Sequence, residues 1–185
     1  MGLDSVELLM TFEKKFKLDI PDAVAEEIAT VGDMTEWLFS MIQLNKPNKY
    51  IQEKILDSIK EALAKSNLVE LIEFSTKLNN IFPFDNRKET WNLFEQNLSI
   101  TLPKLSKKEL ISNNKSTKPS FFDSDINRLT ECIGALNYNK LVDFDNITSK
   151  FEVMLAVMGI TLELSGVDVT EIYYDSRFVY DLGID

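Results

Sequence analysis

The sequence predicts an all-α protein. Only 6 glycines and 5 prolines interrupt its 185 residues, and apolar residues recur at spacings of three and four along most of the chain, as on one face of an α-helix. The hydrophobic content of 44% is ordinary for a folded protein, and the length suffices for one sizeable core or two small ones. We therefore expect helices that pack through buried apolar faces.

The first predicted helix spans residues 3–16. Asp4 or Ser5 would cap its start, because a short polar side chain there can accept a hydrogen bond from a free backbone N–H. The apolar face would be formed by Val6, Leu9, Met10, Phe12 and Phe16.

The next segment, residues 18–42, is expected to contain a break and two further helices. Pro21 lies in the break, where it cannot continue a helix. A short helix is expected at 23–28, and Thr30 or Asp33 would cap a helix that continues to residue 42.

The middle of the chain also has helical periodicity. Residues 50–63 and 68–78 each place apolar residues on one face, which predicts a helical hairpin hinged at residues 66–67. A turn at 82–85 would end in Asp85 as the cap of a helix over 88–98. That helix would bury Trp91, Phe94 and Leu98.

Residues 112–120 contain no apolar side chain. Without apolar side chains to bury, such a segment cannot offset the conformational entropy that is lost on ordering, so a flexible linker is expected there. Helical periodicity resumes over residues 126–136 with Ile126, Leu129 and Ile133.

The C-terminal part is predicted to contain one strongly apolar helix and a long ordered loop. A connection at 137–146 would lead into a helix over 147–164, which Gly166 would end. Residues 167–185 would form the loop, with Tyr173 and Tyr174 pointing one inward and one outward. Its buried anchors would be Val167, Ile172, Phe178 and Leu182.

The charge balance disfavours several partners. The chain has 30 acidic and 20 basic residues, a net charge of -10 and a pI near 4.6. Nucleic acid and anionic membrane surfaces are therefore not expected as partners, whereas basic proteins are. No long apolar run or secretory signal pattern is present in the sequence, so we expect a cytoplasmic protein.

Catalytic and metal chemistry have little support in the composition. The chain has no histidine and a single cysteine, which removes the usual general base and metal ligand and prevents an intramolecular disulfide. Cys132 is expected to be a small buried hydrophobe. Phe121, Phe122, Trp91 and the pair Met154 and Met158 could line a lipid pocket, but at helical spacing they are expected to be core residues. We expect neither a metal site nor an enzyme.

Two stretches at opposite ends of the chain fit together when the C-terminus is read into the N-terminus. The chain ends in DLGID, residues 181–185, and GLDSVELLMTFEKKFKLDIPD begins at Gly2. The combined run resembles the signature of the acyl carrier protein-like, phosphopantetheine-binding family. The resemblance implies a four-helix bundle in which 164–185 supply the end of the first helix and its loop, and 3–42 supply helices two to four.

This resemblance implies a domain that is discontinuous in sequence. Residues 1–46 together with 146–185 would form the bundle, and 47–145 would be a helical region of unknown family inserted between them. The split motif would arise in a circular permutant, in one period of a tandem array, or in molecules whose halves swap. We accordingly expect a monomer or a domain-swapped dimer.

Two registers compete for the serine that carries the prosthetic group in this family. The family pattern implies an interval of about eighteen residues from that serine to the isoleucine of the IPD element. Gly2 lies eighteen residues before Ile20 and Ser5 lies fifteen before it. In the first register Asp185 is the residue directly before Gly2, and the chain lacks the hydroxyl that a phosphodiester needs. The family's buried positions in its second helix are then Leu3, Val6, Phe12 and Phe16. In the second register the run Gly2-Leu3-Asp4-Ser5 is the motif itself, and Ser5 is the acceptor.

The first register predicts an acyl-carrier-like module that works through protein contacts and lacks 4′-phosphopantetheine in this chain. Its partners would be carrier-dependent enzymes or a transferase. One alternative is a functional phosphopantetheinylated carrier of fatty acid or polyketide-type synthesis that uses Ser5; another is a helical lipid- or partner-binding protein. The resemblance also implies an acidic docking face formed by Glu7, Glu13, Asp19 and Asp22, but Lys14, Lys15 and Lys17 interrupt it, so a solvated mixed-charge face is the simpler expectation.

Overall fold

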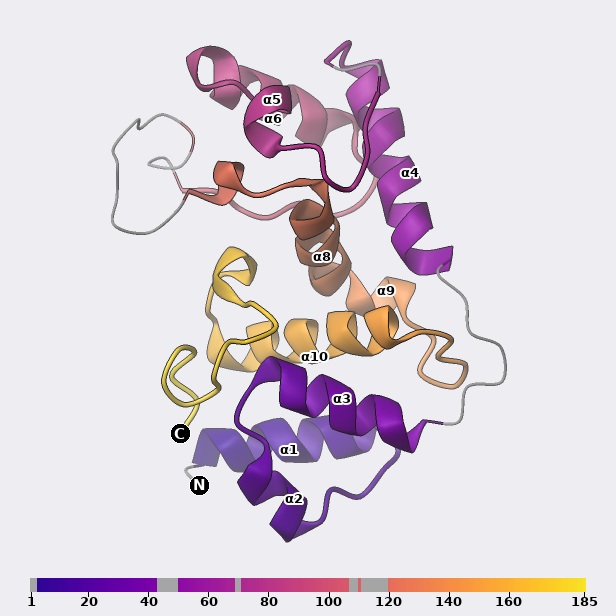
Figure 1. The fold of residues 1–185 in the computed structure, drawn as a ribbon, viewed down its shortest axis with the longest axis vertical. Coiled ribbons are helices and arrows are strands. Elements are labelled where there is room, and N and C mark those ends of the chain that lie inside the picture. The colour runs from indigo at the N-terminus through magenta and orange to yellow at the C-terminus, as the bar shows by residue number, and fades with distance from the viewer. Residues whose placement is uncertain (1–2, 43–49, 69–70, 107–109, 111–119) are drawn as a thin grey trace. The chain divides into compact units, whose positions relative to one another are not determined.

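The computed structural model describes residues 3–42, 50–68, 71–106, 110 and 120–185. Among these residues all regular secondary structure is helical, which confirms the predicted all-α class. Sheet-like pairing within them is limited to two isolated β-bridges. The chain divides into two compact units (Figure 1). Unit 1 comprises Met1–Ile51 and Asn137–Asp185, and unit 2 comprises Gln52–Leu136.

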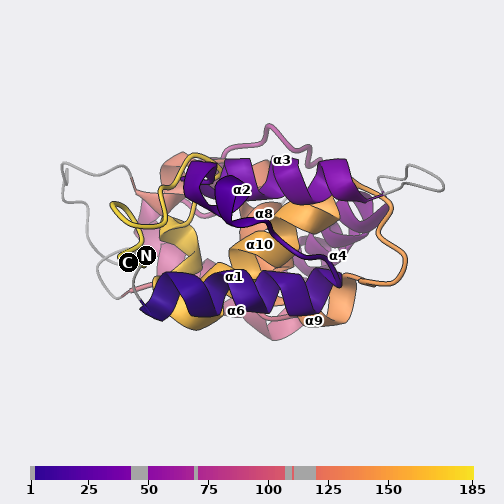
Figure 2. The ribbon, with the colours of Figure 1, turned by 90° about the horizontal axis from the view of Figure 1, so that it is seen from below.

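Unit 1 is built around one central helix. Its elements are α1 (Leu3–Phe16), α2 (Asp22–Glu27), α3 (Val31–Met41), α9 (Tyr138–Leu141), α10 (Lys150–Ser165) and the 3-10 helix η3 (Val169–Glu171). The helices α1, α3 and α9 all contact α10 (Figure 2). A helix that packs on several sides must be apolar all round, and α10 buries Val153, Leu155, Ala156, Val157, Met158 and Ile160.

The predicted extent of α1 is confirmed, and its buried face was predicted correctly at Phe12 and Phe16 but not at Val6 and Met10. Leu8, Phe12 and Phe16 are buried, whereas Val6 is 41% and Met10 62% exposed. The buried residues lie four apart and share one face, and Val6 and Met10 each differ from it by two residues, or about 200°. Asp4 and Ser5 also lie inside α1 rather than before it, so the prediction that one of them caps the helix was wrong.

The start of α3 confirms the prediction at Thr30. The Thr30 hydroxyl accepts the N–H of Asp33 at 3.0 Å, and the Asp33 carboxylate accepts the N–H of Thr30 at 2.9 Å. This capping box satisfies donors that have no partner within the helix. Burial acts to raise the pKa of Asp33, but the hydrogen bonds from Thr30 and Ala29 outweigh it and lower the pKa.

The C-terminal loop is ordered as expected, with two differences. Gly166 ends α10 in the left-handed conformation, with φ of 67°, and the loop buries Val169, Ile172, Phe178, Leu182 and Ile184. Val167 is only half-buried, because the turn of η3 directs Val169 inward instead. Tyr173 and Tyr174 are both exposed, by 48% and 39%, so the prediction that one points inward was wrong.

Unit 2 packs around aromatic rings. It contains most of α4 (Tyr50–Lys65), α5 (Leu78–Ile81), η1 (Phe84–Asn86), α6 (Arg87–Asn97), η2 (Phe121–Asp123) and α8 (Ile126–Leu136). The rings of Phe82 and Trp91 lie 5.0 Å apart in an edge-to-face arrangement, a geometry that aromatic pairs favour. Phe94, Phe121 and Phe122 join this cluster. These residues, Cys132 and Met158 are buried and Met154 is half-buried, as expected of core residues.

The predicted helix over 68–78 is absent from the described residues 71–77, and α5 begins only at Leu78. Backbone pairing with the start of α8 replaces it: Ile126 N–H donates to Thr76 C=O at 2.9 Å, and Leu78 N–H donates to Ser124 C=O at 3.0 Å. The chain leaves α4 through Asn67, whose φ is 54°. A long-range partner therefore outweighs local helical periodicity here.

Three further expectations concern short elements. Asp85 lies inside η1 and the cap position of α6 belongs to Asn86, so the predicted cap was wrong, because the turn of η1 moves the helix start by one residue. The expected connection at 137–146 contains the short helix α9. The predicted linker at 112–120 lies outside the described residues except for Ser120.

Candidate functional site

The start of α1 meets the C-terminal end of the chain. Ser5 N–H donates to Asp185 C=O at an N to O distance of 3.4 Å, and the two ends lie side by side in both views of the fold (Figures 1 and 2). Asp4 and Asp185 are exposed and Ser5 is half-buried. The structure thus brings together three of the four predicted site residues, and Gly2 lies outside the described residues.

The bond between Ser5 and Asp185 has the spacing of an α-helical bond only when Asp185 is counted as the residue directly before Gly2. In a helix each N–H bonds the carbonyl four residues earlier, and the first N–H groups have no such partner. If Asp185 is counted as the residue directly before Gly2, Ser5 is the fourth residue after it. In that count the Asp185 carbonyl has the place of the acceptor four residues before Ser5.

The last residues of the loop are held in place by their own backbone bonds. Ile184 N–H donates to Phe178 C=O at 2.9 Å, and Leu182 N–H donates to Arg177 C=O at 3.2 Å. Gly183 has φ of 69°, a region that favours glycine because a Cβ is crowded there. The glycine of the DLGID run thus turns the chain so that Leu182 and Ile184 are both buried.

The loop is fastened to the first turn of α3. Val31 N–H donates to Ser176 C=O at 3.0 Å and Gly32 N–H donates to Tyr174 C=O at 2.6 Å, while Phe178 N–H donates to Ala29 C=O at 3.0 Å. The first two bonds satisfy N–H groups that have no partner within α3, and the third holds the loop to the residue before its cap.

A polar cluster joins α3, α10 and the loop. The Glu36 carboxylate accepts a hydrogen bond from Tyr174 Oη at 2.5 Å and pairs with the ammonium of Lys150. These bonds, from Lys150 first and Tyr174 second, lower the pKa of Glu36. Sequence reasoning missed the cluster because Glu36 and its two partners lie more than 100 residues apart in the chain.

A second cluster joins α9 to α10 and α1. Tyr138 Oη donates to Glu163 at 2.9 Å, and Lys15 donates to Asn139 at 2.8 Å. Burial of the ring and the hydrogen bond to Glu163 raise the pKa of Tyr138. Lys17 pairs with Asp145 on the surface, with 69% and 74% of the two side chains exposed, as expected of a solvated face, whereas Lys15 also lies 5.4 Å from the centroid of the Tyr138 ring.

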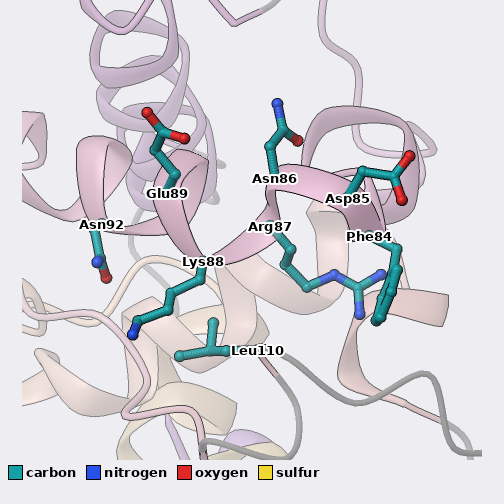
Figure 3. A pocket seen from close by; sticks show the side chains of 8 residues that line it. All are labelled: Phe84, Asp85, Asn86, Arg87, Lys88, Glu89, Asn92 and Leu110. Atoms are coloured by element: carbon teal, nitrogen blue, oxygen red, sulfur yellow. The ribbon is translucent and has the colours of Figure 1, made fainter.

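Unit 2 has an open groove of about 560 Å³ at the start of α6. Figure 3 shows Lys88 directed toward Leu110 and the Arg87 guanidinium beside the ring of Phe84, 5.4 Å from its centroid. Arg87 also donates to Asn79 Oδ1 at 2.6 Å and lies 4.2 Å from the centroid of Phe122. The guanidinium is thus part of the packing of unit 2.

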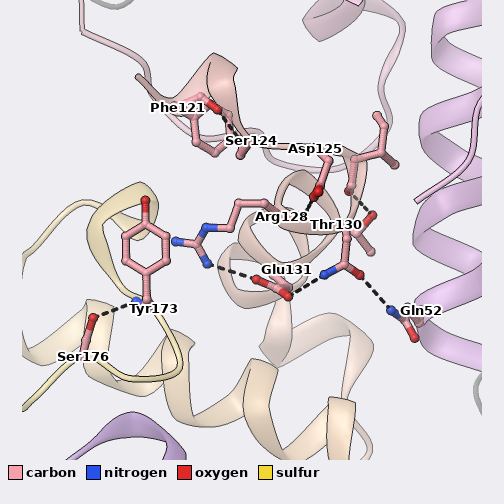
Figure 4. A network of polar contacts seen from close by, with 11 residues as sticks. Gln52, Phe121, Ser124, Asp125, Arg128, Thr130, Glu131, Tyr173 and Ser176 are labelled. Carbon is pink, nitrogen blue, oxygen red and sulfur yellow. Dashed lines mark hydrogen bonds and ion pairs between the residues drawn. The ribbon is translucent and has the colours of Figure 1, made fainter. Parts of the chain in front are cut away.

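A polar network in unit 2 links α8 to α4 (Figure 4). Glu131 accepts from Arg128 at 3.2 Å and from the side-chain amide of Asn127 at 2.8 Å, and Asn127 in turn accepts from Gln52 at 3.2 Å. Each oxygen of the Glu131 carboxylate accepts one hydrogen bond, and such bonds stabilise a half-buried charge. The network has the character of helix packing rather than of a reaction centre.

Metal and membrane sites were searched for in the part of the chain that the structure describes. It contains no group of three or more Cys, Asp or Glu side chains arranged to hold a metal ion. None of its helices is both long and apolar enough to cross a bilayer.

Part of the chain is similar to acyl carrier proteins. It is 56% identical over 37 residues to the acyl carrier protein of Porphyromonas gingivalis, which covers 20% of this chain and 47% of that protein. The acyl carrier protein of Wolinella succinogenes is also 56% identical over 37 residues, covering 20% and 49%. That of Picosynechococcus sp. is 64% identical over 32 residues, covering 17% and 40%.

The chain spans about half the length of the curated relatives it matches, or less. No family profile matches the chain, and no solved structure matches it. The similarity therefore establishes an acyl-carrier-like region within a longer helical chain.

Proposed function

We propose that unit 1 is an acyl-carrier-like module assembled from both ends of the chain, that it acts through protein contacts, and that it is not itself an enzyme. The observation that carries the proposal is the helix-type bond from Ser5 N–H to Asp185 C=O. It supports the register in which Asp185 is followed by Gly2, at the position of the family's serine. The local sequence identity to acyl carrier proteins also supports an acyl-carrier-like module.

The start of α1 also favours this register over the one that uses Ser5. If Ser5 were the acceptor, Leu3 and Asp4 would belong to the loop before the helix, but both lie inside α1. A phosphodiester to 4′-phosphopantetheine needs a hydroxyl on the residue after Asp185, and Gly2 has none. The residues at this position do not fit the prosthetic group.

The charge distribution favours basic protein partners such as carrier-dependent enzymes. Of the 30 acidic and 20 basic residues, 18 and 8 fall in unit 1, while the 12 acidic and 12 basic residues of unit 2 cancel. Unit 1 therefore carries the whole net charge of -10. A field of one sign steers partners of the opposite charge toward the surface.

Modification in vitro tests the register. The full chain, Gly2→Ser and Ser5→Ala are each incubated with coenzyme A and a broadly specific phosphopantetheinyl transferase, and their intact masses are measured. We expect only Gly2→Ser to gain one phosphopantetheine group, at position 2. Modification of the unsubstituted chain that is lost in Ser5→Ala would establish the Ser5 carrier instead, and an unmodified Gly2→Ser would contradict the proposed register.

A rearranged chain tests the count independently of any modification. Residues 137–185 are followed directly by residues 2–51, and a control keeps Met1 between the two segments. We expect both chains to be helical, with the direct junction more stable by about 1 kcal/mol, the worth of one hydrogen bond, because the extra residue spoils the four-residue spacing. Equal stability by urea denaturation, or greater stability of the control, would count against the register.

A further inference from the structure

Gly32 allows an unusually close approach between α3 and the C-terminal loop. A Cβ at this position would lie 2.6 Å from Tyr174 Cε1, 2.8 Å from Tyr174 Cδ1 and 2.9 Å from the Tyr174 carbonyl oxygen. These distances are shorter than real Cβ atoms tolerate, and one of the atoms belongs to the backbone. The hydrogen bond from Gly32 N–H to Tyr174 C=O, at 2.6 Å, therefore requires glycine.

This contact begins a continuous series of backbone bonds that ends at α1. Loop residues 174–178 bond to residues 29–32 at the start of α3, Phe178 C=O then accepts Ile184 N–H at 2.9 Å, and Asp185 C=O accepts Ser5 N–H at 3.4 Å. The rings and side chains of Phe178, Leu182 and Ile184 are buried along the way. A displacement of residues 174–178 would thus be passed to Asp185 through bonds and packed side chains.

We infer that Gly32 is a positioning residue for the junction between Asp185 and the first turn of α1. It acts at a distance, by letting the loop dock on α3 in the one position that presents the Asp185 carbonyl to Ser5. The inference rests on the proposed function only for the biological use of this junction, since the bonds that define it stand independently. Its consequence is that crowding at residue 32 loosens the chain ends before it loosens α1 itself.

Amide hydrogen exchange on the full chain, followed by NMR, measures this directly. In Gly32→Ala we expect the amides of Ile184 and Ser5 to exchange roughly tenfold to a hundredfold faster, the range that overpacking of a fitted contact produces. The amide of Phe12, inside α1, reports the global stability of unit 1 in the same sample. The matched control is Val157→Ala, which removes buried methyl groups from α10 and leaves the residues of the loop and of the start of α3 unchanged.

The positioning role predicts a selective effect that a merely structural role would not give. Ile184 and Ser5 should accelerate more than Phe12 in Gly32→Ala, and all three should accelerate together in Val157→Ala. Adding Tyr174→Ala to Gly32→Ala should restore much of the protection, because two of the three crowded atoms belong to the ring. Equal acceleration at all three amides in Gly32→Ala would overturn the inference.

Two further comparisons keep the test decisive. If Gly32→Ala does not fold, Tyr174→Ala is compared with the double variant Tyr174→Ala/Gly32→Ala. The double variant must exchange faster at Ile184, because the carbonyl of residue 174 remains 2.9 Å from the added Cβ, and equal rates would overturn the inference. In the Gly2→Ser background, Gly32→Ala should slow phosphopantetheinylation. A Gly2→Ser chain that is never modified contradicts the proposed function alone, and the exchange result still decides the role of Gly32.

Discussion

Gly183→Ala isolates the backbone contribution of the DLGID turn. Gly183 has φ of 69°, and a Cβ built there meets no atom within 4 Å. The substitution therefore adds no contact with other parts of the chain and removes no side chain. Its effect on stability should come only from holding an alanine in the left-handed region.

The magnitude follows from two opposing terms. A residue with a Cβ in the left-handed region loses about 1–2 kcal/mol, while alanine restricts the unfolded chain and returns about 0.4–1 kcal/mol. We expect a net loss of about 1 kcal/mol. Gly166→Ala is the matched control, because Gly166 has φ of 67° and equally open surroundings, so it should lose a similar amount. Gly183→Asn should lose less, since asparagine tolerates this conformation.

The two tryptophans of the chain allow each unit to be followed separately. Trp37 lies in α3 of unit 1 and Trp91 lies in α6 of unit 2. Urea unfolding is recorded by fluorescence in a Trp91→Phe background, which leaves Trp37, and in a Trp37→Phe background, which leaves Trp91. Gly183→Ala should shift only the Trp37 transition.

Three results would refute this reasoning. A loss in Gly183→Asn as large as in Gly183→Ala would show that strain at positive φ is not the cause. A shift of the Trp91 transition would show that the turn acts beyond unit 1. A loss above about 3 kcal/mol would require crowding, which the open surroundings of Gly183 do not provide.

Three other substitutions test the remaining contacts. Thr30→Ala should destabilise unit 1 by about 1 kcal/mol in urea, with Thr30→Ser nearly unchanged, because only the hydroxyl cap differs; equal losses would contradict the cap. Phe82→Ala should destabilise unit 2 by about 3–5 kcal/mol in the Trp91 transition, because its fully buried ring contacts three others; a loss below about 1 kcal/mol would contradict its central place in the cluster. Glu36 has a lowered pKa in the folded protein, so its bonds stabilise unit 1 above its ordinary pKa and are lost as pH falls through the lowered value. Glu36→Gln should flatten that acid limb in a pH series of thermal unfolding, and an unchanged limb would exclude a role for the carboxylate.

Local patterns predicted those parts of the fold whose causes are local. The bounds of α1 and α8, the cap at Thr30 and the stop at Gly166 depend on residues within one or two turns. Periodicity alone did not identify which face of α1 is buried, because Val6 and Met10 are as apolar as the buried Leu8. Only the position of α10 decides between those faces.

The misassigned helix at 68–78 and the missed polar clusters have a common cause. Residues 74–78 form backbone bonds with residues 124–127, and Tyr174 is bonded to a carboxylate that is 138 residues away. No window of sequence contains both partners of such a pair. Gly32 offered one weak signal, because a glycine near the start of a helix loses stability relative to alanine and so suggests a close backbone approach.

The sequence offered two competing predictions for the candidate site, one from the residue count and one from a local motif. Counting residues across the two ends places Asp185 beside the first turn of α1, and Ser5 N–H donates to Asp185 C=O; the position of the family's serine remains a proposal. The local motif Gly2-Leu3-Asp4-Ser5 pointed instead to a hydroxyl that lies inside the helix. Of the buried positions that the count assigned on α1, Phe12 and Phe16 are buried, but Val6 is 41% exposed, because a count fixes the order of residues and not the face that packs on α10.

Unit 1 is built from two segments that are distant in sequence, which lowers its stability little but slows its folding. Leu8, Phe12 and Leu38 are buried in unit 1, and their helices α1 and α3 pack on α10, which is made more than 100 residues later. The entropy of closing such a loop rises by only about 0.6 kcal/mol for each doubling of its length, less than the roughly 2–3 kcal/mol from burying one phenylalanine. Contacts of such high sequence separation slow folding much more than they lower stability. Unit 2, whose residues are contiguous, should therefore fold first, and α1 to α3 must wait for the C-terminal segment before they can bury their apolar faces.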